Sequence, residues 1–414
     1  MPLVFDGTAG TIVGVSSGGL PANTITSTQI AANTVTSSQL ATGSVEGYIQ
    51  NTSSSFGFRN ILHNGAMQID QHNAGANTSA TYGSVSNYGL DRWQVNNYSG
   101  TTSNSIYFQQ VADAPPGFYQ SLKVQCTNGV ATSSNSTGRR NISQYVEGLN
   151  IQHLNWGTSN AKPVTLSFWV KSSLTGTFAI SLEEVNTTAA SYVTTYNITQ
   201  ANTWQYFVFN IPGPTISTWS TNSSGSLAVW FDIGQGSSIS ASSSTQLNSW
   251  QAADYRGYIN AVHIGDTSGA TFQVTGVQLE LGNQATPYEH RPYGVELAIC
   301  QRYFWNFNSA TQGGSYMKFG MGTNINTTLC RANFVLPVQM RAVPNITYSG
   351  ASTFAVSCAA GDIAVSSISL NPNIGTNLIC GDFTVGSASL VSGGSGCVEA
   401  NGTTGAYILV SAEL

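Results

Sequence analysis

Residues 271–304 read TFQVTGVQLELGNQATPYEHRPYGVELAICQRYF, and this stretch decides how the rest of the chain is interpreted. Its first part alternates as a strand does, with a slip of one residue at Gly276 that a β-bulge would cause. Pro287 and Pro292 then mark a turn, because proline is excluded from regular strand pairing and from helix interiors. Helical spacing follows. The expected apolar positions of the strand are Phe272, Val274, Val277, Leu279 and Leu281, and one side of the expected helix carries Val295, Ala298, Ile299, Arg302 and Tyr303.

The segments VQLE and ELAICQRYF, joined by ATPYEHRP, resemble a junction that recurs in tail-fibre and related structural proteins of tailed bacteriophages. There the junction lies between a carbohydrate-binding-module-like β-sandwich and a smaller terminal domain. Other pieces, from FRNILHNGAMQI to the closing YILVSAEL, extend the resemblance over most of residues 56–414. It implies a part of a virion, assembled in the host cytoplasm and acting outside the cell, and it implies no particular chemistry.

Composition narrows the class of protein. The 414 residues leave room for two or three domains, and only 7% of them are charged, against roughly 25% in an average soluble domain. With 10% aromatic residues the chain lacks the signature of disorder. A net charge of −5 without a basic cluster argues against nucleic acid as a partner. No long apolar run predicts membrane insertion, and the first residues do not read as a secretory signal, which fits release by host lysis.

A repeat occupies the region after the first 14 residues. ANTITSTQIA (Ala22–Ala31) is followed directly by ANTVTSSQLA (Ala32–Ala41), with seven of ten positions identical. Large apolar residues recur every five positions at Val15, Leu20, Ile25, Ile30, Val35, Leu40 and Val45. This period fits neither a helix nor a strand, and a single copy has nothing against which to bury these side chains. We therefore expect a three-chain shaft; the alternative is a flexible Ser/Thr-rich linker.

Many short strand-like runs separated by turn signals predict an all-β fold. In TLSFWVK, Leu166, Phe168 and Val170 face one way, as in one layer of a two-sheet sandwich. The expected strands are Ser105–Ala112, Gln120–Thr127, Arg140–Gly148, Val164–Ser173, Thr177–Val185, Thr203–Ile211, Leu227–Gly234, Tyr258–Gly265 and Thr271–Leu281. The expected organisation is a virion-anchoring segment (1–14), a repeat shaft (15–55), a jelly-roll-like, carbohydrate-binding-module-like β-sandwich (56–293), a junction helix (294–304) and a second small β domain (305–414).

The sequence offers no clear catalytic centre. Glu183 and Glu184 are adjacent on an expected strand, so they point to opposite faces and cannot form one site. Asp254 and Asp266 lie in or near loops, where either could approach another acid, although solvated loop carboxylates are the simpler interpretation. Glu147 and Glu280 are expected as edge or surface charges. We predict no enzyme activity and no cofactor.

Metal and disulfide signals are also weak. No pair among the five histidines has metal-ligand spacing, so no metal is expected. The cysteines are Cys126, Cys300, Cys330, Cys358, Cys380 and Cys397. Their even number allows disulfides, but assembly in a reducing cytosol favours free, buried thiols.

Sugar binding needs aromatic rings to stack on sugar C–H faces and neutral groups to bind hydroxyls. Trp169, Trp204 and Trp230 lie within expected strands and are assigned to the core or a sheet face. Trp219, in ISTWSTNSSGS, has polar neighbours and is expected to be exposed. Trp305 and Tyr316, beyond the junction, are expected to be exposed as well. These three are the predicted ligand-binding residues.

Together these features predict a homotrimeric, tail-fibre-like virion protein that is attached to other virion proteins through its N-terminus. Its leading function is multivalent, non-catalytic binding of a host-surface glycan during adsorption. One alternative is a head fibre, decoration or tail protein without receptor binding. A depolymerase that cleaves host polysaccharide is the third interpretation.

Overall fold

The computed structural model describes residues 4–6, 11–13, 58–80, 88–98, 105–131, 136–186, 190–371 and 375–414, with the backbone alone for 4–6 and 11–13. The chain divides into two compact units, residues 1–55 and 56–414. In the first unit, β1 (Val4–Asp6) pairs antiparallel with β2 (Thr11–Val13). The seven shaft positions from Val15 to Val45 lie outside the described residues, so the trimeric shaft stays a prediction.

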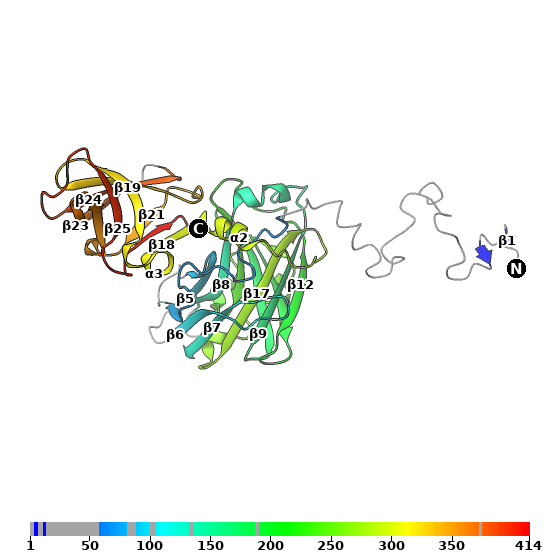
Figure 1. Ribbon diagram of the computed structural model, residues 1–414. Coiled ribbons are helices and arrows are strands. Elements are labelled where there is room, and N and C mark those ends of the chain that lie inside the picture. Colours follow the sequence, from blue (N-terminus) through cyan, green and yellow to red (C-terminus); the bar gives the residue numbers. More distant parts are fainter. Residues whose placement is uncertain are drawn as a thin grey trace. The chain divides into compact units, whose positions relative to one another are not determined.

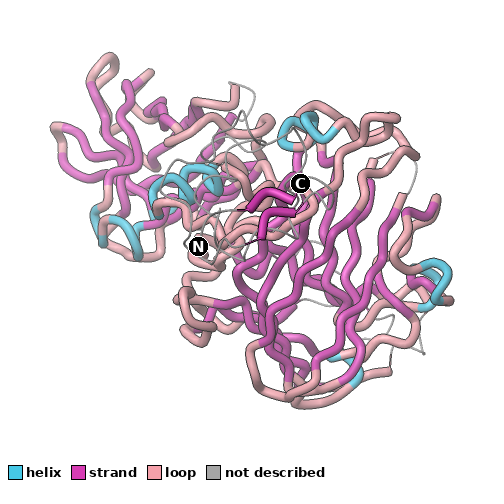
Figure 2. The backbone as a smooth tube through the Cα atoms, turned by 90° about the vertical axis from the view of Figure 1, so that its right-hand side faces the viewer, coloured by secondary structure: helices cyan, strands magenta, loops and turns pink. Residues whose placement is uncertain are grey.

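Two antiparallel sheets pack face to face in the second unit, which confirms the predicted all-β sandwich (Figures 1 and 2). Among the described residues, one sheet has seven strands, in the order β15 (Trp250–Gln251), β11 (Ser191–Ile198), β10 (Gly176–Glu184), β13 (Gly225–Asp232), β8 (Arg139–Glu147), β5 (Trp93–Tyr98) and β4 (Tyr88–Leu90). The other has six in the same described part: β12 (Gln205–Ile211), β9 (Val164–Ser172), β17 (Thr271–Leu281), β7 (Ser121–Asn128), β6 (Ser105–Val111) and β3 (Thr78–Ala80).

The core between the sheets follows the predicted alternation. Leu166, Phe168 and Val170 of β9 are fully buried, together with the inward residues of β10, β13 and β17. One expected strand, Tyr258–Gly265, is wrong. Only β16 (Gly257–Tyr258) forms there, parallel to β14 (Ser240–Ala241), and the chain then turns into η7 (Ile264–Asp266). Apolar residues of this run cover the outside of the seven-stranded sheet at Ala179 and Val193, so their burial needs no strand.

The bulge in the opening stretch is confirmed. The register of β17 on β9 shifts between Thr275 and Gln278, and Gly276 has a φ of +63°. The helix is confirmed as α2 (Tyr293–Gln301), which begins after Pro292, but its expected apolar side is wrong. Glu296 and Cys300 are the buried residues of α2, whereas Val295 is 37% exposed. The carboxylate of Glu296 can be buried because it accepts a hydrogen bond from the backbone N–H of Asn64 and pairs with Arg291.

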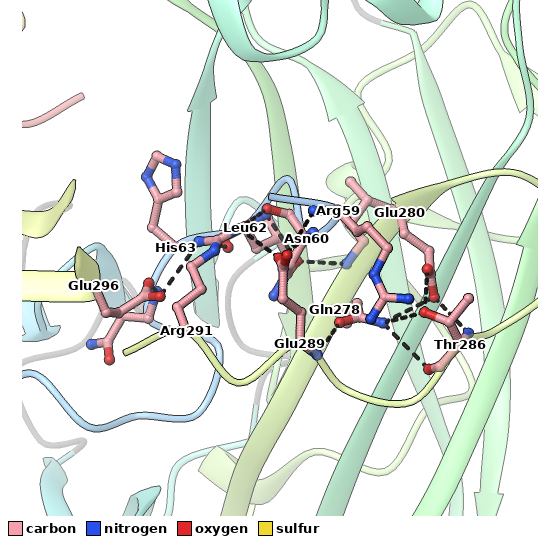
Figure 3. Close-up of polar contacts among 12 residues, drawn as sticks. Arg59, Asn60, Leu62, His63, Gln278, Glu280, Thr286, Glu289, Arg291 and Glu296 are labelled. Atoms are coloured by element: carbon pink, nitrogen blue, oxygen red, sulfur yellow. Dashed lines mark hydrogen bonds and ion pairs between the residues drawn. The ribbon is translucent and has the colours of Figure 1, made fainter. Parts of the chain in front are cut away.

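Those donors belong to a hydrogen-bond network that we name the Glu289 clamp: Glu289, Arg291 and Glu296, with the segment 59–64 that they hold (Figure 3). The carboxylate of Glu289 accepts from the backbone N–H groups of Arg59 (3.0 Å) and Asn60 (2.9 Å). Arg291 bridges the carboxylates of Glu289 (3.2 Å) and Glu296 (3.4 Å). Burial alone would raise the pKa of Glu289, but the two N–H donors and Arg291 lower it.

The same network continues onto β17. The side-chain amide of Asn60 donates to the carbonyl of Val277 (2.9 Å) and accepts from the N–H of Leu279 (3.0 Å). Glu280, which is 3% exposed, accepts from the N–H (2.8 Å) and hydroxyl (2.6 Å) of Thr286. The polar side chains of the VQLE and ATPYEHRP segments therefore connect the beginning of the sandwich to its end, which is a structural role.

The residues after α2 form a second β assembly. β18 (Phe304–Asn308), β26 (Tyr407–Ser411) and β21 (Asn345–Tyr348) make a small sheet, and six strands of the described part close a barrel. The barrel order is β19 (Lys318–Asn324), β20 (Leu329–Val335), β24 (Leu378–Val385), β23 (Gly361–Asn371), β22 (Phe354–Cys358) and β25 (Ser395–Ala400). Short helices α3 (Ser309–Gln312), η8 (Gly314–Tyr316) and η9 (Ala351–Thr353) connect these strands.

Charged pairs join this assembly to the sandwich. Arg302, just after α2, makes a two-pronged contact with Glu147 of β8 (2.9 and 3.0 Å). The buried Arg92 forms an ion pair with Glu413 and lies 3.5 Å from the centre of the Tyr303 ring. The expectation that Glu147 and Glu280 are surface charges is therefore wrong, because Glu147 is 1% exposed and Glu280 is 3% exposed. Each is paired inside the protein instead.

The six cysteines are thiols, and Cys126, Cys300 and Cys330 are buried as predicted, whereas Cys358, Cys380 and Cys397 are only half-buried. Among the described residues, no group of three or more His, Cys, Asp or Glu side chains is placed to hold a metal ion. None of the helices in the described ranges is both long enough and apolar enough to cross a bilayer.

Candidate functional site

A hollow of about 300 Å³ opens where two loops of the sandwich meet. One loop joins β8 to β9 and contains η3 (Gly148–Asn150) and η4 (Gln152–Leu154), and the other joins β12 to β13. The lining consists of Ile151, Gln152, Asn155, Trp156, Gly157, Thr158, Ser217, Thr218, Trp219, Ser220 and Thr221. None of these side chains carries a charge, and most of them are amides or hydroxyls.

Close backbone contact between the two loops shapes the hollow. Gly157 has a φ of +81°, and a Cβ there would lie 2.6 Å from the carbonyl oxygen of Ser217. Only glycine allows this approach. Asn155 and Ser217 also have positive φ values, of 53° and 69°. Asn155 ends η4 in the left-handed conformation that asparagine tolerates, whereas the conformation of Ser217 costs of order 1 kcal/mol.

Three tryptophans form the wall behind the hollow. The rings of Trp156 and Trp219 are nearly perpendicular, with centroids 4.7 Å apart, and Trp250 lies 5.6 and 5.7 Å from the two. Each indole N–H donates to a backbone carbonyl, at Lys162 (2.8 Å) for Trp156, Ile216 (3.2 Å) for Trp219 and Pro212 (2.6 Å) for Trp250. The polar atoms of the rings are thus satisfied, and only the small exposed parts of Trp156 (6%) and Trp219 (7%) face the hollow.

The predicted ligand-binding residues are not brought together. Trp219 lines the hollow but is only 7% exposed, so its expected exposure is wrong; its polar sequence neighbours form the rim while its ring packs inward. Trp305 is 8% exposed and stacks on Phe307 (4.6 Å) in the core of the second assembly, so its expected exposure is wrong too. Tyr316, at the end of η8, is exposed as predicted. Ligand contact by the three stays a prediction.

Sequence reasoning missed Trp156 and Trp250, although a signal for Trp156 existed. It lies in LNWGTSN, a polar setting like that of Trp219. Trp250 lies in LNSWQ, which is also polar, but its place beside the other two follows from the edge position of β15 and could not be read from the sequence.

Asp254 does approach another acid, as the sequence allowed. Asp254 and Glu183 both contact the same Nε of Arg256, at 2.8 and 2.9 Å. Burial and the neighbouring Asp254 raise the pKa of Glu183 to about 8, although Arg256 opposes the shift. The guanidinium lies 4.5 Å above the ring of Trp230, so the arginine is fixed in place. Both carboxylates are occupied by this pairing, and Asp266 is likewise bound to Arg140 (2.8 Å).

No protein-family model and no curated protein matches the chain. Several solved structures resemble part of it. A Bacteroides thetaiotaomicron protein described as sugar-binding is 10% identical over 54% of this chain and 100% of its own, with a TM-score of 0.32. The enzymatically active domain of tailspike protein 4 of bacteriophage CBA120 is 14% identical over 54% of this chain and 22% of its own (TM-score 0.29). A family 11 carbohydrate-binding module of Clostridium thermocellum is 12% identical over 47% of this chain and 91% of its own (TM-score 0.24). These scores are too low to assign a function.

Proposed function

We propose that this chain is a fibre-like structural protein of a tailed-phage virion and that it binds a host-surface glycan without cleaving it. The observation that supports glycan binding is the uncharged hollow beside Trp156 and Trp219. Fixed aromatic carbon next to several amides and hydroxyls matches the two needs of a sugar ring. The virion role is supported by the resemblance of the junction stretch to phage fibre proteins.

The lining also limits the ligand. Because no charged side chain faces the hollow, a neutral sugar fits better than an acidic one. A volume of about 300 Å³ is at the small end of the range for ligand sites, which runs from roughly 300 to 1,000 Å³. We infer that the hollow takes the one or two sugar units at the end of a glycan.

Weak single sites suffice if the chain is trimeric. Three copies held together by the repeat at residues 15–55, and anchored to other virion proteins through residues 1–14, would raise the avidity without new contacts. Cleavage is not part of the proposal. Glycoside hydrolysis needs two available carboxylates, about 5–9.5 Å apart, whereas Glu183 and Asp254 are both engaged by Arg256.

The test is an array of bacterial capsule and O-antigen polysaccharides probed with the full chain and a hollow variant. Gln152→Ala with Thr221→Ala removes two hydrogen-bonding groups, and the affinity should fall about tenfold if the net loss is about 1.4 kcal/mol. Ser159→Ala with Asn160→Ala, in the same loop but outside the lining, is the matched control. Equal binding by both variants would contradict the site. Release of reducing ends would favour the depolymerase, and normal adsorption of particles lacking the chain would remove receptor binding.

A further inference from the structure

A second group of aromatic residues lies on the outer face of the six-stranded sheet, on β9, which follows one loop of the hollow, and at β12, which precedes the other. Tyr206 of β12 pairs in register with Trp169 of β9, which pairs in turn with Thr275 of β17. Because Phe168 and Val170 point into the core, Trp169 points outward. The Trp169 and Tyr206 rings have centroids 5.1 Å apart, and Tyr206 is 42% exposed.

Asp113 holds a third ring beside them. Its carboxylate accepts from the indole N–H of Trp204 (3.3 Å) and from the amide of Gln273 (3.1 Å), and it forms an ion pair with Lys171. The ammonium of Lys171 lies 5.4 Å from the centre of the Trp204 ring. We call Trp169, Trp204 and Tyr206, with Asp113 and Lys171, the aromatic platform. Contacts from four segments fix its rings before any ligand arrives.

The glycine bulge of β17 belongs to the same surface. A Cβ at Gly276 would lie 2.6 Å from Cζ of Phe118 and 3.1 Å from Cδ1 of Trp169, so the bare glycine lets both rings settle against β17. Phe118 in turn packs edge-on against Tyr288, with centroids 5.0 Å apart. Rings therefore run from Tyr206 and Trp169 toward Phe118 and the junction, which makes an elongated surface rather than a single contact.

We propose that the aromatic platform binds an internal stretch of a glycan chain, as a second site distinct from the hollow. Ring faces suit sugar C–H groups, and the exposed carboxylate of Asp113 and the ammonium of Lys171 lie within the patch to bind hydroxyls. A protein partner fits less well, because the centre of a protein interface is depleted of charged residues. Asp113 and Lys171 neutralise each other, so the platform requires no charge on the sugar. The platform is an open sheet face, so a glycan chain can extend past it in both directions, whereas the hollow accepts only the end of a glycan.

This inference rests on the proposed glycan binding and adds a surface to it. The probe is the array polysaccharide that the full chain retains most strongly, used both intact and as its isolated disaccharide in affinity electrophoresis. Trp204→Ala with Tyr206→Ala should weaken binding of the polymer about tenfold or more while leaving the disaccharide nearly unaffected. Tyr206→Phe keeps the ring and should retain binding. Val208→Ala, on the same strand and equally exposed, controls for changes in β12. Circular dichroism confirms that each variant is folded.

The outcomes separate the two proposals. If no polysaccharide is retained by the intact chain, both proposals fail. If polymer binding survives loss of Trp204 and Tyr206 but is lost in the Gln152/Thr221 variant, the platform proposal is overturned and the hollow stands. If the platform variant keeps polymer binding but changes the oligomeric mass in light scattering, the surface is a contact between copies of this chain and the proposal is also overturned.

Discussion

Replacing Gly276 by alanine tests whether the bulge shapes the sheet face as described. Two costs add. A side chain at φ +63° is strained by about 1 kcal/mol, and the new Cβ, 2.6 Å from Phe118 and 3.1 Å from Trp169, must push rings aside at about 1–3 kcal/mol. We expect Gly276→Ala to lower the free energy of unfolding by about 2–4 kcal/mol, measured by urea denaturation followed by far-UV circular dichroism.

Gly75 provides the matched control. Its φ is +78° and a Cβ there would meet nothing within 4 Å, so Gly75→Ala should cost only the backbone strain, about 1 kcal/mol. Adding Phe118→Ala to Gly276→Ala should cost less than the sum of the two single changes, since the shorter of the two close contacts, that with Phe118, is then removed. If the Gly276 and Gly75 variants are equally stable, or if the double variant is simply additive, the reasoning about crowding at the bulge is refuted.

Three further predictions follow from other parts of the molecule. Arg302→Ala strands the buried Glu147 carboxylate and should cost about 3 kcal/mol in urea denaturation, whereas Arg302→Ala with Glu147→Gln should recover part of that loss. The pKa of His63 is well below 6.5 in the folded protein, because burial and then the charges of Arg92, Arg291 and Arg302 disfavour the protonated ring. The folded state therefore loses stability as the pH falls below 6.5, where the unfolded chain binds the proton more readily. His63→Gln should therefore flatten the decline in stability between pH 7 and 5, and an unchanged slope would contradict this. Light scattering should give a trimer for the full chain and a monomer for residues 56–414; equal states would remove the shaft.

Local sequence patterns predicted the parts of the fold that depend only on residues close together in the sequence. Alternation placed Leu166, Phe168 and Val170 in the core, and the slip at Gly276 placed the bulge, because strand period and glycine geometry are local properties. Closure of the C-terminal barrel had no such marker. It depends on the pairing of β19 with β25, whose residues are more than 70 positions apart in pairs such as Met321 and Cys397.

Buried acids show the same limit. Glu147 and Glu280 are expected as edge or surface charges because acids are rarely buried without partners, and the sequence carries no expectation for Glu296. The partner of Glu147 is Arg302, 155 residues later, and that of Glu296 includes Asn64, 232 residues earlier. The hollow likewise needs Trp156 and Trp219 from two loops whose meeting is set by the strand order of both sheets. Residue types suggested sugar binding, but only tertiary structure selected which tryptophans share a site.

The Glu289 clamp has a mechanical consequence. Residues 59–64 enter the sandwich beside β17, and Tyr293 begins the helix that leads out of it, so incoming and outgoing chain are fastened to each other by Glu289 and Asn60. Tension along the polypeptide would be borne first by these hydrogen bonds, including those that Asn60 makes to Val277 and Leu279 of β17. Because the two ends of the sandwich are bonded to each other, most of a pulling force would pass through this network, and the strand pairs within the two sheets would carry less of it.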